Sequence, residues 1–148
     1  MSEVFCVPID IRFAHCDPAG IVFYPRYFEL INGVVEDWCA QGLGMSFHEM
    51  HVVKDIGLPT VHIETDFVKT SMLGDRLTAS LKVLKLGRAS VTVEICMHGV
   101  DHQNQQDREA DLRLRAQLVL VMAHVKERKA IAFPEKLREQ MQRYLAAA

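Results

Sequence analysis

The sequence lacks the patterns that usually indicate export, membrane insertion or a thiol centre. Its four cysteines are widely spaced and include no CxxC pair. No apolar stretch approaches the ~20 residues of a membrane span. No charged segment followed by an apolar run stands at the N-terminus, so we expect no signal peptide. Scattered cysteines in such a chain are most simply reduced thiols, which predicts a cytoplasmic protein.

The chain also lacks a basic excess and the short motifs of several enzyme classes. Its 17 Lys and Arg residues are balanced by 19 Asp and Glu residues, whereas nucleic-acid binding requires a clustered basic excess. It contains no GxSxG, GxGxxG, P-loop or HExxH motif. His48 and His51 have the spacing of one helix face, but no third ligand follows at a recognisable distance. We therefore predict no nucleic-acid partner, no metal site and no bound cofactor.

The region around residues 5–41 contains the strongest structural signals. Residues 5–13 alternate between apolar and polar side chains, which predicts a half-buried strand. The following Asp17-Pro18-Ala19-Gly20 sequence suits a type I turn. Apolar residues then recur at helical spacing from Pro25, which predicts a helix over 25–41, about 25 Å long and ended by Gly42. This helix is apolar around more than half its circumference, so other elements must wrap it.

The rest of the chain is rich in predicted strands with short connections. A capping-box pattern at Ser46 and Glu49 predicts a short helix over 46–54, and Pro134 begins a C-terminal helix. The polar segment 99–111 is predicted to be an exposed, mobile loop. Alternation predicts strands over 61–67, 77–83, 91–97 and 112–122, with a short one over 130–133.

These elements predict the fold class and suggest an assembly. Hairpin-length connections make neighbouring strands antiparallel, and a mostly buried helix needs a curved sheet around it. We therefore predict one α+β domain with an antiparallel sheet packed on one long helix. Val119 and Val121 make the predicted fifth strand apolar on both faces, which suggests that a second subunit covers its outer face.

Asp17 admits two interpretations. In the first, its carboxylate only caps the turn that it forms with Pro18 and Gly20. In the second, the carboxylate lies just ahead of the N-terminus of a buried helix, where free N–H groups and the helix dipole stabilise developing negative charge. The local pattern leaves both interpretations open.

The run from Phe13 to Glu29, FAHCDPAGIVFYPRYFE, resembles the signature of the 4-hydroxybenzoyl-CoA thioesterase family. Its core, CDPAGIVFYPRY, is specific in content and spacing, and the resemblance extends more loosely through FVKTSMLGDRL to about Pro134. It implies a single hotdog thioesterase domain over residues 1–148, with a curved antiparallel sheet wrapped around one long central helix. It also implies a homodimer or homotetramer with active sites at the subunit interface.

The activity implied by the resemblance is hydrolysis of an aromatic or short to medium acyl-CoA, so that coenzyme A belongs to the substrate. In the family the aspartate of the CDPAG motif is the catalytic carboxylate, and the amide that matches Tyr24 polarises the thioester carbonyl. Asp17 would act as nucleophile or as general base. Thioester hydrolysis is consistent with these two groups, because a thiol with a pKa of ~8.5 departs as a thiolate without a proton donor. One carboxylate and one oxyanion donor then suffice.

Other residues are candidates for contacts with the substrate. His15 stands where many relatives carry aspartate, and it either pairs with Asp17 or has a pocket or spectator role. The candidates for the acyl pocket are Phe23, Tyr27 and Pro59. The candidates for the phosphates of coenzyme A are Lys85, Arg88, Arg128 and Lys129, which otherwise belong to solvated turns.

Three alternatives remain open from the sequence. Other hotdog thioesterases carry their carboxylate on the long helix, where Glu29 and Glu36 are the candidates here. A hotdog dehydratase or hydratase is a second alternative, although no histidine-containing site for it can be assembled. A non-catalytic acyl-CoA-binding module is the third, because a fold does not determine a function.

Overall fold

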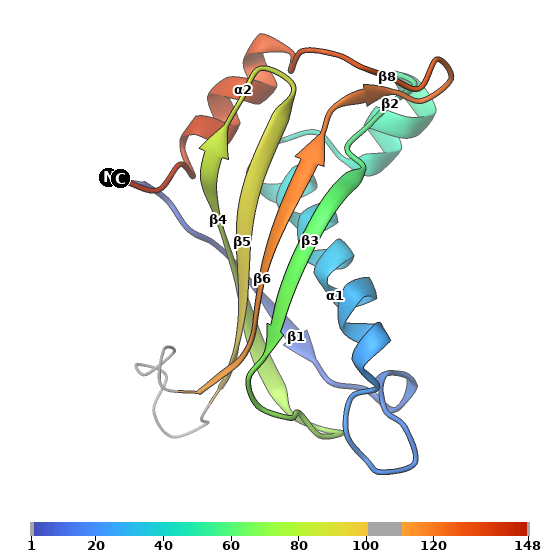
Figure 1. Ribbon diagram of the computed structural model, residues 1–148, viewed down its shortest axis with the longest axis vertical. Coiled ribbons are helices and arrows are strands. Elements are labelled where there is room, and N and C mark those ends of the chain that lie inside the picture. Colours follow the sequence, from blue (N-terminus) through green and yellow to red (C-terminus); the bar gives the residue numbers. More distant parts are fainter. Residues whose placement is uncertain (1, 101–110, 148) are drawn as a thin grey trace.

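The predicted long helix lies across one face of a curved sheet (Figure 1). A computed structural model describes residues 2–100 and 111–147. The helix, α1, covers Tyr24–Asp37, and the sheet has five antiparallel strands in the order β1-β4-β5-β6-β3. The strands are β1 (Phe5–Asp10), β3 (Thr60–Phe67), β4 (Arg76–Leu86), β5 (Ser90–Gly99) and β6 (Leu112–Val121). The predicted α+β architecture is confirmed.

The core lies between α1 and the sheet. Because successive side chains of a strand point to opposite faces, the alternating pattern makes one sheet face apolar. The buried residues on that side come from β4, β5 and β6: Leu77, Ala79, Leu81, Val83, Val91, Val93, Ile95, Met97, Leu114, Ala116, Leu118 and Leu120. Helix α1 contributes Tyr27, Ile31, Val34 and Val35. On the outer face, Val119 and Val121 are half-buried within the single chain, so a covering subunit stays a prediction.

The strand predicted over residues 5–13 is shorter than its alternating pattern. Its pairing ends at Asp10, which lies opposite Arg76, the first residue of β4. Beyond that point Ile11 instead bonds with the turn before β4, and residues Phe13–His15 form a 3-10 turn, η1. Phe13 is consequently 83% exposed. The prediction was wrong beyond Asp10 because β4, the partner strand, begins at Arg76 and offers no residue to pair with residues 11–13. The alternating pattern does not show where the partner strand begins.

The end of the long helix also differs from the prediction. After Asp37 the chain continues as a wide helical turn, η2 (Trp38–Gly42), in which Leu43 N–H donates to Trp38 O at 2.9 Å. The predicted helix end at Gly42 is wrong, because Gly42 belongs to this turn and Gly44, with φ +75°, takes the left-handed conformation common just after a helix. Gly42 is needed for a different reason: a Cβ there would lie 2.8 Å from Trp38 Cδ1 and 2.9 Å from Tyr144 Oη.

Short elements close the end of the fold opposite the Asp17 loop (Figure 1). Glu49 N–H donates to Ser46 Oγ at 3.1 Å, which confirms the predicted helix start, and η3 follows. A small sheet joins β2, β7 and β8, and α2 follows Pro134 as predicted. The bounds are η3 (Glu49–Val53), β2 (Ile56–Gly57), β7 (Ala123–His124), β8 (Lys129–Ala130) and α2 (Glu135–Gln142).

The segments 130–133 and 99–111 lie near these strands in the sequence. The predicted strand over 130–133 is wrong beyond Ala130, because Ile131 N–H bonds to Met122 O whereas Phe133 N–H bonds to Arg88 O. Those acceptors belong to different segments and make no single ladder. The loop predicted over 99–111 lies largely outside the described residues. Among residues 2–100 and 111–147, no helix has the length and apolar character needed to cross a bilayer.

Two glycine substitutions test the packing at the end of the helix. Gly42→Ala should lower the free energy of unfolding by about 1–3 kcal/mol, because the new methyl group overlaps two aromatic side chains. Gly33→Ala in α1 is the matched control, since an added Cβ meets no atom within 4 Å. It should raise stability by about 0.4–1 kcal/mol. Urea unfolding followed by circular dichroism measures both, and equal effects would contradict this account.

Candidate active site

Asp17 begins the loop that leads into α1, and its side chain is only partly used by that loop. Gly20 N–H donates to Asp17 O at 2.9 Å, as a type I turn requires, and Gly20 has φ +81°. Ala19 N–H donates to Asp17 Oδ1 at 2.9 Å. Within the described chain this is the one hydrogen bond to the Asp17 carboxylate, so Oδ2 is unpaired. The turn-capping interpretation is therefore correct for one oxygen and leaves the other available.

Tyr24, the first residue of α1, presents an unpaired backbone N–H. The residue before it, Phe23, has no side-chain oxygen with which to cap the helix, and Pro25 has no N–H. Arg26 N–H donates a hydrogen bond to Phe23 O at 2.8 Å. None of the described residues accepts a hydrogen bond from Tyr24 N–H. This amide points out of a helix N-terminus, where the dipole favours negative charge.

The loop folds back on itself, so that Asp17 lies opposite Ile21 and His15 lies opposite Phe23, the residue before the helix. Asp17 N–H donates to Ile21 O at 3.0 Å, and Phe23 N–H donates to His15 O at 2.9 Å. The His15 ring is held elsewhere, because its Nδ1 accepts from Arg12 N–H at 2.8 Å. That bond leaves the ring proton on Nε2. No hydrogen bond joins His15 to Asp17 in the described part of the chain.

An aromatic cluster lies next to this loop. Phe67, at the end of β3, has its ring centroid 6.1 Å from that of Tyr24, 5.9 Å from Tyr27 and 6.4 Å from Phe28. Phe23 packs edge-on against Tyr24 at 5.8 Å. Tyr27 is buried, whereas the other four rings are substantially exposed. Phe23 and Tyr27 stay predicted substrate contacts. The sequence did not single out Phe67 and Phe28, because it does not show that the end of β3 packs against α1.

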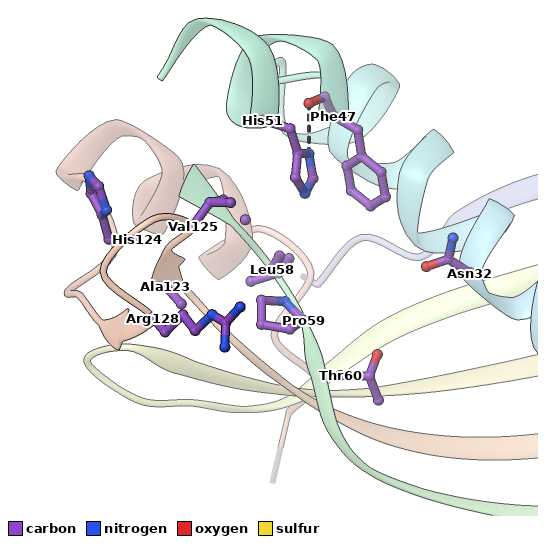
Figure 2. Close-up of a pocket in the computed structure, with 11 residues that line it drawn as sticks. Asn32, Phe47, His51, Leu58, Pro59, Thr60, Ala123, His124, Val125 and Arg128 are labelled. Carbon is purple, nitrogen blue, oxygen red and sulfur yellow. Dashed lines mark hydrogen bonds between the residues drawn. The ribbon is translucent and has the colours of Figure 1, made fainter. Parts of the chain in front are cut away.

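Pro59 and Arg128 line a different cavity, at the opposite end of α1 (Figure 2). Its volume is about 590 Å³, and its other lining residues are Asn32, Phe47, His51, Gly57, Leu58, Thr60, Ala123, His124 and Val125. Asn32 follows Tyr24 by about 12 Å along the helix axis, so this cavity does not reach Asp17. A smaller cavity of about 370 Å³ adjoins Asp17 itself.

The predicted site residues thus fall into two groups within one chain. Asp17, Tyr24 and their neighbours lie at the N-terminal end of α1, whereas the residues predicted to bind coenzyme A lie at the other end. The latter are Lys85 near the end of β4, Arg88 in the turn after β4, Arg128 in the turn before β8, and Lys129, the first residue of β8. All four are exposed, and none forms an ion pair with a described residue.

The alternative carboxylates and the histidine pair occupy other surroundings. Glu29 is exposed and pairs with Arg26 at 2.7 Å, and Glu36 is exposed on the same helix. His51 Nδ1 lies 2.8 Å from Phe47 O (Figure 2). Over the described ranges, no group of three His, Cys, Asp or Glu side chains is arranged to hold a metal ion.

Arg113 on β6 forms a bonded cluster that the sequence did not reveal. Its guanidinium donates to both carboxylate oxygens of Asp111 at 2.8 and 3.0 Å. Through Nη1 it also donates to Asp75 Oδ2 at 2.9 Å, Ser71 Oγ at 3.1 Å and Thr70 O at 3.2 Å. Only 12% of the Arg113 side chain is exposed. Hydrogen bonds from Arg113 hold the pKa of Asp111 at about 2.

The chain is similar in sequence and in fold to known thioesterases. Residues 11–141 match the sequence profile of the thioesterase-like superfamily. The 1,4-dihydroxy-2-naphthoyl-CoA hydrolase of Synechococcus elongatus is 26% identical over 133 residues, or 89% of this chain and 90% of that protein.

Two solved structures share the fold. That of 4-hydroxybenzoyl CoA thioesterase from Pseudomonas sp. strain CBS-3 has a TM-score of 0.81 and 25% identity, over 94% of this chain and 99% of that chain. A D17N mutant of 4-hydroxybenzoyl CoA thioesterase, complexed with 4-hydroxybenzoyl CoA, has a TM-score of 0.82 and 24% identity, over 95% and 99% of the two chains.

The fold and these comparisons define a thioester hydrolase of hotdog fold. Because the profile match spans most of its length, the chain belongs to the thioesterase-like superfamily. The predicted fold and the predicted enzyme class are both confirmed.

The Arg113 cluster predicts a specific sensitivity to acid. Hydrogen bonds from Arg113 and Lys69 lower the pKa of Asp111 from 3.8 to about 2, so the carboxylate stabilises the folded state fully above about pH 4. This contribution disappears as the pH falls toward 2. Solvent screening reduces it to roughly 1 kcal/mol. Urea unfolding should show Asp111→Asn losing this increment at pH 7 and little at pH 2, whereas Asp10→Asn, at an exposed site, should match the parent throughout.

Proposed function

We propose that this hydrolase cleaves acyl-CoA thioesters with Asp17 as the catalytic carboxylate and Tyr24 N–H as the oxyanion donor. The observation that carries the proposal is the conjunction of two unpaired groups in one tight loop. Asp17 Oδ2 has no hydrogen bond from the described chain, and Tyr24 N–H has no acceptor there. Each group supplies one of the two requirements for attack on a thioester carbonyl.

The reaction can follow two routes from the same carboxylate. As nucleophile, Asp17 Oδ2 attacks the thioester carbon, the C–S bond breaks, and the coenzyme A thiolate leaves an acyl–aspartyl anhydride that water hydrolyses. As general base, Asp17 takes a proton from water, whose oxygen attacks the same carbon. In both routes Tyr24 N–H donates to the carbonyl oxygen as it gains negative charge. The products are a carboxylic acid and the thiol of coenzyme A.

An aromatic acyl group suits the surroundings of Tyr24. Exposed rings of Phe23 and Phe67 lie beside that residue, and the exposed ring of Phe28 packs against Phe67. Aromatic rings pair favourably edge to face. The curated relative that matches over 89% of this chain is named for a dihydroxynaphthoyl-CoA substrate, which points to the same class. A flat aromatic acyl chain is thus favoured over a short aliphatic one.

The proposed dimer would unite the two groups of site residues. Strand β3 is an edge strand. Its helix-side residues Ile63 and Phe67 are 36% and 50% exposed, and Val61, at a register shift of the strand, is 61% exposed. Its ends, Thr60 and Phe67, are about 23 Å apart. Antiparallel pairing of two β3 edges about a two-fold axis would bring the Thr60 end of one protomer beside the Phe67 end of its partner.

This arrangement assigns different tasks to the two ends of α1. The cavity with Pro59 and Arg128 would lie next to the Tyr24 loop of the other protomer, so one acyl-CoA would span both chains. The four cations Lys85, Arg88, Arg128 and Lys129 would then be available to the phosphates of coenzyme A.

Asp17→Asn tests the chemistry. The amide oxygen of the new side chain can still accept from Ala19 N–H, so the fold and the affinity for a non-hydrolysable acyl-CoA analogue should persist. The rate constant kcat should fall at least ~10²–10⁴-fold, because an amide serves neither as base nor as nucleophile. Glu29→Gln and Glu36→Gln are the matched controls and should retain parental kcat.

Other results of this experiment would favour the alternatives. An Asp17→Asn variant with more than about a tenth of the parental kcat lies outside that range and would remove Asp17 from the chemistry. A parent that binds acyl-CoA analogues but hydrolyses no acyl-CoA would be a binding module. Hydration of an enoyl-CoA without thiol release would identify a hydratase.

Val61→Asp tests the interface. A charge at Val61, on the edge strand β3, costs little in a single chain, where Val61 is 61% exposed, but pairing of this edge with a second protomer would bury it. We expect light scattering to show a dimer or tetramer for the parent and a monomer with little activity for the variant. His62→Asn, on the opposite face of the same strand, should preserve both assembly and rate. A fully active parental monomer at micromolar concentration would contradict the shared site.

A further inference from the structure

The Asp17 loop is held in place by a turn from a distant part of the chain. Val22 N–H donates to Ser71 O at 2.9 Å, and Leu73 N–H donates to Gly20 O at 3.3 Å. Ile21 also forms an antiparallel bridge with Met72. The turn Ser71–Asp75 therefore fixes residues 20–22, which lie between Asp17 and Tyr24 in the sequence.

The same turn is fastened on its other side by Arg113. The guanidinium donates to Ser71 Oγ, Asp75 Oδ2 and Thr70 O. Asp75 Oδ2 in turn accepts from Met72 N–H at 2.9 Å, so one carboxylate links the guanidinium to the backbone of the turn. The bidentate contact with Asp111 orients the guanidinium.

Ser71 connects the two sets of bonds. It is 1% exposed, its Oγ accepts from Arg113, and its carbonyl accepts from Val22. One path of hydrogen bonds from β6 to the loop thus runs through this buried residue. A planar guanidinium satisfies several acceptors at fixed angles, which a lysine ammonium cannot reproduce.

We propose that Arg113 is a positioning residue for the hydrolysis: through Ser71 it holds the Ser71–Asp75 turn against residues 20–22 and keeps Asp17 and Tyr24 N–H in reacting geometry. This inference rests on the proposed roles of Asp17 and Tyr24. It concerns the transition state rather than substrate affinity, because the proposed coenzyme A contacts lie at the other end of α1.

The test compares kcat and KM for hydrolysis of 4-hydroxybenzoyl-CoA by the full chain and its variants. Arg113→Lys keeps the charge but loses the planar fork, so kcat should fall between about 10- and 100-fold, the range expected for ångström-scale misplacement. The value of KM should stay within about twofold, as expected when an interaction made only in the transition state is lost. Ser71→Ala removes one acceptor of the guanidinium and should also lower kcat, by a smaller factor than Arg113→Lys. Arg115→Lys, two residues along β6 with an exposed side chain, should leave both constants unchanged.

A stability control separates positioning from general destabilisation. Ile95→Val removes a methylene from the core and typically lowers stability modestly, and it should leave kcat unchanged when assayed well below its melting temperature. If its kcat falls as much as that of Arg113→Lys, the positioning role is wrong. If Arg113→Lys does not fold, Ser71→Ala decides by the same criterion.

Asp17→Asn distinguishes the two levels of the proposal. Suppose that Asp17→Asn is inactive while Arg113→Lys and Ser71→Ala keep kcat within about twofold of the parent, as expected where no transition-state interaction is lost. The positioning role of Arg113 is then wrong, and the proposed role of Asp17 stands. A rise in KM at constant kcat also overturns the positioning role. If Asp17→Asn retains activity, the proposed chemistry fails and the positioning role fails with it.

Discussion

The start of α1 is the constraint on which the candidate site depends. A helix N-terminus leaves backbone N–H groups without intrahelical partners, and most helices satisfy them with a polar cap. Here Phe23 provides no cap, Pro25 removes one donor, and Arg26 bends back to Phe23 O. Tyr24 N–H thus has no acceptor among the described residues, at the end of the loop that Asp17 begins. The wrapped sheet keeps the helix from shifting to satisfy that amide in another way.

The fold could be predicted from the sequence because it follows from two local periods. Alternation located β3, β4, β5 and β6, and helical spacing located α1, since burial of one face imposes each period. The errors arose where a distant contact decides the outcome. Gly42 serves the packing of Trp38 against Tyr144, and β1 ends where β4 begins. Neither contact leaves a local signal.

The candidate site was predictable only in part, for a related reason. Asp17 and Tyr24 belong to one short motif, so a resemblance to a known family located both. Phe67 and Arg113 reach the same region from other strands, and only the strand order places them there. The sequence likewise suggested no separation between the Tyr24 loop and the Arg128 cavity, because a local pattern does not show which part of α1 lies near Arg128.

The exposed edge of β3 has a consequence for the protein before assembly. A newly folded protomer presents an unpaired strand edge next to several exposed aromatic rings, a combination that templates intermolecular β pairing. Association with a second copy would hide that edge. The contact that completes the proposed site would therefore also protect the chain from aggregation. A mutation that breaks this contact without adding a charge to the edge would promote aggregation and lower activity together.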